Sequence, residues 1–163
     1  MTSGNRDPVK AGTCFTGRSD EEQAREDEGT NEAIAKVQAK LFHRAFSEFI
    51  HGLTQDPRLM RAWRLIEVEY PEPGLTLSRA ARVAGVSKDH LNVLIRERCG
   101  LTFYQLLIRY RLLRVTMMIR ESPDRTSLDL ALEAGFGSLD ALERNFKRMT
   151  GITVRTFRVG SRS

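Results

Sequence analysis

The side chains best suited to chemistry in this sequence are cations, and they gather in its C-terminal half. Residues 77–163 hold 16 Lys and Arg against 8 Asp and Glu, whereas residues 1–76 hold 10 against 13. A segment with a clear excess of Lys and Arg attracts polyanions over its whole surface. The charge distribution therefore predicts a polyanionic partner for the basic half.

Nucleophiles and metal ligands are sparse by comparison. Cys14 and Cys99 lie 85 residues apart, and His43, His51 and His90 form no metal-ligand pattern with them. His90 and Cys99 are the only nucleophile and base near each other in the basic half, and no third residue is placed to orient them. We therefore expect no enzyme, no metal site and no cofactor, and we expect Cys99 to serve in packing.

The sequence shows no signal for membrane insertion or export. No apolar run approaches the roughly 18 residues of a membrane span, and the N-terminus lacks a basic start followed by an apolar core. Two distant cysteines favour a reduced protein. These features predict a cytoplasmic location and no membrane partner.

Before the basic half, the sequence predicts a tail and a connector. Residues 1–31 are rich in Gly, Ser, Thr and charge, which is typical of a disordered acidic tail. Within residues 32–74, Asp56 is placed to cap a helix that begins at Pro57 and ends before Pro71. No later stretch alternates apolar and polar residues for long enough to predict a strand. The predicted fold class is all-α.

Glu32 to Leu53 is predicted to form an amphipathic helix with an unusually apolar face, because large side chains recur every three or four positions. Such a face is normally covered. One interpretation is a homodimer; the other is packing against the helix that begins at Pro57. The residues proposed for the dimer are Ile34, Val37, Leu41, Phe42, Phe46 and Phe49.

A pattern in the basic half occurs twice, about fifty residues apart. The first copy contains Ala81, Gly85, Ser87, Leu91, Ile95 and Gly100, and the second contains Ala131, Gly135, Ser138, Leu142, Phe146 and Gly151. The first glycine of each copy can end a helix in the left-handed conformation, and the serine can cap the next helix. One such unit is equally compatible with a plain helical hairpin. Two units in a basic segment favour paired helix-turn-helix readers of successive major grooves.

From about Leu75 to Arg158 the chain resembles the C-terminal DNA-binding domain of AraC/XylS-type bacterial transcription regulators. The matching residues are Ala81, Gly85, Ser87, Leu91, Gly100, Arg111, Ala131, Gly135, Phe136, Ser138, Arg144, Phe146, Lys147, Gly151 and Arg158. The resemblance implies two helix-turn-helix units joined by a long helix over residues 103–121, within a domain of residues 75–159. The sequence departs from the pattern at Leu142, Val154, Phe157 and Val115, where we expect adjusted packing. Only 55 residues precede Asp56, so no effector-binding domain is expected.

The resemblance also implies which side chains meet DNA, since the second helix of each unit enters the major groove in this family. The candidates are Lys88, Asp89, Asn92, Val93 and Arg96 in the first unit, and Leu139, Asp140, Glu143, Arg144 and Lys147 in the second. Asn92 suits adenine and Arg144 suits guanine. Val93 stands where a polar reader is expected, so the first unit is expected to read little. Asp140 and Glu143 repel phosphates unless one accepts from cytosine.

The linking helix supplies further phosphate candidates in Arg109, Arg111 and Arg114. Its apolar stripe is predicted to contain Phe103, Leu107, Tyr110, Leu113 and Met117.

The function predicted from the sequence is a sequence-specific DNA-binding transcription regulator, with double-stranded DNA as its partner and RNA polymerase as a further candidate partner. The alternative is a degenerate relative that acts mainly as a protein interaction module. Salt-dependent retention on DNA separates the two.

Overall fold

The protein is described by a computed structural model, which places residues 29, 32, 35, 36, 38, 39, 44, 47, 48, 50–53 and 55–161. Its helices are α2 (Pro57–Glu69), α3 (Leu77–Ala84), α4 (Lys88–Cys99), α5 (Phe103–Glu121), α6 (Ser127–Glu133), α7 (Leu139–Thr150) and α8 (Val154–Ser161). The described residues contain no strand. The all-α prediction is confirmed. The predicted tail lies outside the described residues except for Gly29.

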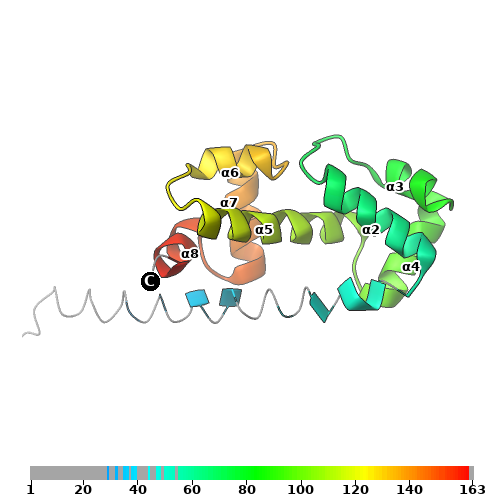
Figure 1. Cartoon of the computed structure of the whole chain (residues 1–163), viewed down its shortest axis with the longest axis horizontal. Helices are drawn as coiled ribbons and strands as arrows, with labels where there is room; N and C mark the ends of the chain where they lie inside the picture. The colour runs from blue at the N-terminus through cyan, green and yellow to red at the C-terminus, as the bar shows by residue number, and fades with distance from the viewer. Residues whose placement is uncertain are drawn as a thin grey trace, which may run out of the picture.

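Two groups of helices lie at opposite ends of α5, which runs between them (Figure 1). Helices α2, α3 and α4 pack together at its N-terminal end, and α6, α7 and α8 pack at its C-terminal end. The duplicated sequence pattern corresponds to α3–α4 in the first group and α6–α7 in the second. The long helix thus joins two units of the same construction.

The turn inside each unit forms as its sequence predicts. Gly85 and Gly135 adopt positive φ angles of 75° and 80°. Ser87 then accepts a hydrogen bond from the His90 N–H at 3.2 Å, and Ser138 accepts from the N–H of Ala141 at 3.2 Å. Each hydroxyl satisfies a first-turn amide that has no partner within its helix. The second helix of each unit therefore begins at a fixed residue and in a fixed direction.

Helix α5 contributes to two separate cores. Phe103, Leu106 and Leu107 belong to the core of the first unit, whereas Leu112, Val115, Met118 and Ile119 belong to the core of the second. The apolar face changes along the helix because the two groups pack on different sides of it. The predicted stripe holds as far as Leu113, since Tyr110 and Leu113 both pack, partly buried, against the first core, whereas Met117 belongs to neither core.

The residues that depart from the family pattern all lie inside the protein. They are Val115, Leu142, Val154 and Phe157, and none is more than 2% exposed. The Phe157 ring packs edge-on against that of Phe146, with ring centroids 5.5 Å apart. All four belong to the second core, so the departures fall at packing positions.

The two units are also joined by the segment that follows α2. The Arg111 side chain on α5 donates from Nε to the Tyr70 carbonyl at 2.8 Å and from a terminal guanidinium nitrogen to the Glu72 carbonyl at 2.8 Å. Gly135, in the turn of the second unit, lies against the same backbone. A Cβ atom at this glycine would lie 2.5 Å from the Tyr70 oxygen and 2.8 Å from the Pro71 oxygen. We refer to Arg111, Gly135 and residues 70–72 as the inter-unit clamp.

The described residues between 29 and 53 are helical and lie along one side of both units (Figure 1). Ala35 is buried next to Gly160, whose Cβ would lie 3.0 Å from that of Ala35. Ala39 belongs to the second core, and Leu53 belongs to the first. The part of this segment that the structure describes therefore packs within the chain, on both units rather than on α2 alone.

The homodimer predicted from Ile34, Val37, Leu41, Phe42, Phe46 and Phe49 concerns side chains that lie outside the described residues. It stays a prediction.

Candidate nucleic-acid interface

The second helix of each unit presents exposed cations. On α4, Lys88 and Arg96 are exposed, and on α7, Arg144 and Lys147 are exposed. Of these four cations, Arg96 and Lys147 occupy the same position in the two copies of the repeat. Cations on a helix surface suit phosphate oxygens and the acceptor edge of guanine.

Two of the predicted readers are engaged inside the protein. Asn92 Oδ1 accepts from the N–H of Phe103 at 3.1 Å, and Glu143 Oε2 accepts from the N–H of Val154 at 3.4 Å. Each bond spans eleven residues and ties the second helix of a unit to the first amide of the helix that follows it. The Glu143 carboxylate also lies at the positive end of the α8 dipole. Both side chains thus have structural roles, and the predicted repulsion between Glu143 and phosphates is reduced.

The other two acids among the candidate DNA-binding residues, Asp89 and Asp140, stay exposed. Asp89 and Asp140 are both solvent-accessible in the first turn of their helices, and Leu139 is partly buried. An acid in a first turn is stabilised by the partial positive charge of the free amides. Asp89 and Asp140 can therefore be accommodated without a partner on DNA.

The arginines of the linking helix differ in their surroundings. Arg111 is 9% exposed, and burial lowers the pKa of its guanidinium. Because its donors point to the carbonyls of the inter-unit clamp, it holds the protein together and is not placed to bind a phosphate. Arg114 lies over the Tyr70 ring, 5.6 Å from the ring centroid. Arg109 is half-buried and keeps its predicted role as a phosphate candidate.

Two arginines of α2 that have no role among the sequence predictions support the first unit. Arg61 donates to the Ala84 carbonyl at 2.7 Å, at the end of α3. Arg58 is paired with Asp56 and lies 3.2 Å from His90 Nε2 in the first turn of α4. The hydrogen bond from Arg58 holds the pKa of the Asp56 carboxyl well below its usual range. No short spacing signals these contacts, since they join residues 23 and 32 positions apart.

Cys99 packs at the edge of the first core, as the sequence predicts. Burial raises the pKa of its thiol to about 11. The thiol therefore stays protonated at neutral pH and is a poor nucleophile.

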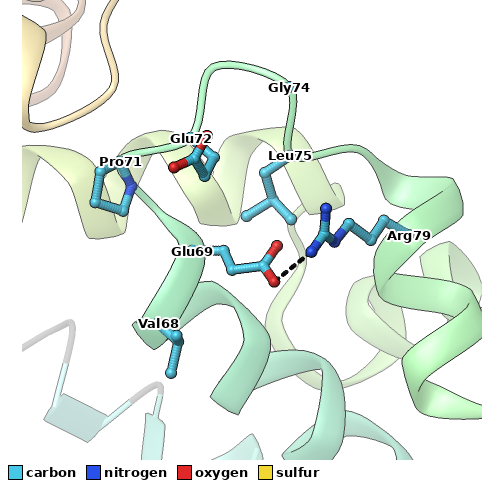
Figure 2. A pocket seen from close by; sticks show the side chains of 7 residues that line it. All are labelled: Val68, Glu69, Pro71, Glu72, Gly74, Leu75 and Arg79. Atoms are coloured by element: carbon cyan, nitrogen blue, oxygen red, sulfur yellow. Dashed lines mark hydrogen bonds and ion pairs between the residues drawn. The ribbon is translucent and has the colours of Figure 1, made fainter.

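A pocket lies between the end of α2 and the start of α3, away from the two helices that are candidates for DNA contact (Figure 2). Its lining includes Glu69 and Arg79, which form an ion pair at 2.6 Å. No residue of α4 or α7 lines it. Glu72 also lines the pocket, so its carboxylates outnumber its single cation and the pocket offers no complement to an anionic ligand.

The part of the chain that the structure describes can be searched for a metal site and for a membrane-spanning helix. Among those residues no group of three or more His, Cys, Asp or Glu is placed to hold a metal ion. None of the helices there combines the length and apolar character needed to cross a bilayer.

These features define a double helix-turn-helix domain. A family profile described as "Helix-turn-helix domain" matches residues 80–159. An uncharacterized HTH-type transcriptional regulator of Staphylococcus aureus strain COL is 28% identical over 107 residues, which make up 66% of this chain and 14% of that protein. Over residues 80–159 the chain is similar to helix-turn-helix domains of AraC-type regulators.

Solved structures show the same fold. An AraC-type transcriptional regulator from Chromobacterium violaceum aligns with a TM-score of 0.62 at 24% identity, over 66% of this chain and 95% of that one. The DNA-binding domain of AdpA, a global transcriptional factor solved in complex with a target DNA, aligns with a TM-score of 0.57 at 25% identity, over 66% and 94%. This chain spans about a seventh of the length of its curated Staphylococcus aureus relative, which is 14% covered.

Proposed function

We propose that the protein is a transcription regulator that binds double-stranded DNA sequence-specifically by placing α4 and α7 in successive major grooves. The observation that carries the proposal is the construction of the two units. Each holds its second helix by a glycine turn, a serine cap and a side-chain bond to the next helix, and each presents exposed cations on that helix. A rigid helix with cations on its free face is suited to the major groove.

The cations divide into two roles. Arg144 lies in the middle of α7, and its planar guanidinium can donate to O6 and N7 of one guanine. Lys88, Arg96 and Lys147 are suited to phosphates, which position the domain on DNA without reading its sequence. The inter-unit clamp supports this arrangement, because it fixes one unit relative to the other before DNA is bound.

The alternative is a degenerate relative that acts mainly through protein association. One oxygen of Asn92 and one of Glu143 are hydrogen-bonded within the protein, which supports weaker base reading by these two side chains. The exposed basic residues of both helices favour DNA binding instead. RNA polymerase remains a candidate partner for a DNA-bound regulator.

Replacing a base reader and replacing a phosphate contact should have different consequences. We expect Arg144→Ala to cost roughly 1–3 kcal/mol on a selected duplex and to relax the preference at one base pair. Arg109→Ala should weaken binding to all sequences alike. Both variants are to be titrated with a duplex selected from a random pool and with unselected DNA. Equal losses on the two DNAs for both variants would contradict base reading by Arg144.

A further inference from the structure

The exposed faces of α4 and α7 are alike at two repeat positions, and they differ at a position between these two. Asp89 and Asp140 occupy the same repeat position in the first turn, and Arg96 and Lys147 occupy the same position two turns later. Between them lies Val93 in the first unit and Arg144 in the second. All six side chains are exposed. The two helices therefore share an acid in the first turn and a cation two turns later, and among their differences is the side chain between them, Val93 in α4 and Arg144 in α7.

Packing within the protein does not explain why residue 93 is a valine. It is 49% exposed and belongs to neither core, whereas Leu94 and Ile95 beside it are buried in the first core. β-Branched residues also have lower helix propensity than the straight-chain residues that usually occupy such a position. Single exposed valines are common on protein surfaces, so the exposure of Val93 does not by itself indicate a functional role. Its place in the repeat is what distinguishes it.

Neighbouring contacts fix the direction in which Val93 points. Asn92 is bonded to the Phe103 amide on one side, and Leu94 and Ile95 are held in the core on the other. Helix α4 therefore cannot rotate to bury Val93 without breaking these contacts. The valine stays on the free face between Asp89 and Arg96, where Arg144 lies in the second unit.

We propose that Val93 reads the C5-methyl group of a thymine while Arg144 reads a guanine, so that the two units recognise different base pairs. The inference rests on the proposed function, since it assumes that α4 enters the major groove. Thymine is the only base that presents a methyl group there, and apolar side chains contact it directly. A site with two unlike halves also determines which unit binds which half, so the chain binds in one orientation.

The test removes the methyl group from the DNA rather than from the protein. Each thymine of the selected duplex is replaced in turn by deoxyuridine, which keeps the base pair and lacks only the methyl. For the unaltered chain we expect one position in the half-site of the first unit at which affinity falls about fourfold, the value of one buried methyl group. Val93→Ala should bind the thymine duplex about fourfold more weakly and should no longer distinguish thymine from uracil at that position.

Val83→Ala is the matched control, because Val83 is 43% exposed on α3 of the same unit and lies outside the reading helix. This variant should keep the full response to uracil. Circular dichroism on all three proteins checks that helix content is unchanged. Equal affinity for thymine and uracil at every position, or a response that survives Val93→Ala, would overturn the inference and leave DNA binding intact. Failure of the unaltered chain to bind any duplex would instead overturn the proposed function.

Discussion

Gly135→Ala is expected to destabilise the protein by about 4 kcal/mol, which is large for the addition of one methyl group. An alanine at φ 80° is strained by roughly 1–2 kcal/mol, and its Cβ would also lie 2.5 and 2.8 Å from two backbone oxygens of the inter-unit clamp. Backbone at this contact can move only if the two units separate. Urea unfolding followed by circular dichroism measures the change in free energy of unfolding.

Gly85→Ala provides the matched control for this substitution. Gly85 occupies the same repeat position at φ 75°, but the nearest atom to its Cβ would be Arg61 Nη2 at an ordinary 3.8 Å. This variant should lose only the roughly 1–2 kcal/mol of left-handed strain. If the two variants are equally destabilised, the close approach at Gly135 contributes nothing and the clamp is not a rigid contact.

Arg111→Ala is expected to cost about 3 kcal/mol of stability. The substitution removes a 9% exposed side chain and leaves the Tyr70 carbonyl without the donor that the structure gives it. Arg109→Ala on the same helix should cost less than about 1 kcal/mol, because Arg109 is half-buried and more of its surface is in water. Urea unfolding of both variants measures the difference.

DNA binding provides a second readout for the same pair of variants. Where Arg111→Ala is still folded, it should leave the salt dependence of DNA binding unchanged, since Arg111 contacts no phosphate. Arg109→Ala should reduce the slope by about 1. A reduced slope for folded Arg111→Ala would show that the guanidinium reaches DNA after all.

The helices could be predicted from the sequence because local residues determine their ends. The linking helix predicted at residues 103–121 is α5, which has these bounds. Asp56, Ser87 and Ser138 cap the helices that they were predicted to cap. A cap depends on a hydroxyl or carboxylate and an amide two or three residues away, so its signal is contained in a short stretch of sequence.

The roles of individual polar side chains were harder to predict from the sequence, because residues far away in the chain determine them. Arg111 has the character of a phosphate-binding residue in the sequence, and its burial depends on a carbonyl 41 residues earlier. Asn92 and Glu143 appeared to be free readers for the same reason. Here the repeat did contain a usable signal: a polar residue precedes the next helix by eleven positions in both units. The shared spacing indicates that the two side chains have the same position relative to the helix that follows.

If the basic half binds DNA through both units, its binding to a selected duplex should depend steeply on salt concentration. With about six phosphates neutralised, log affinity should fall with log salt concentration at a slope of about −5, which is about a thousandfold loss for a fourfold rise in salt. Fluorescence anisotropy of a labelled duplex, titrated with the whole chain at several salt concentrations, gives this slope. A steep slope near this value is the predicted result. A flat response, or no binding at low salt, would contradict the account and favour a protein interaction module.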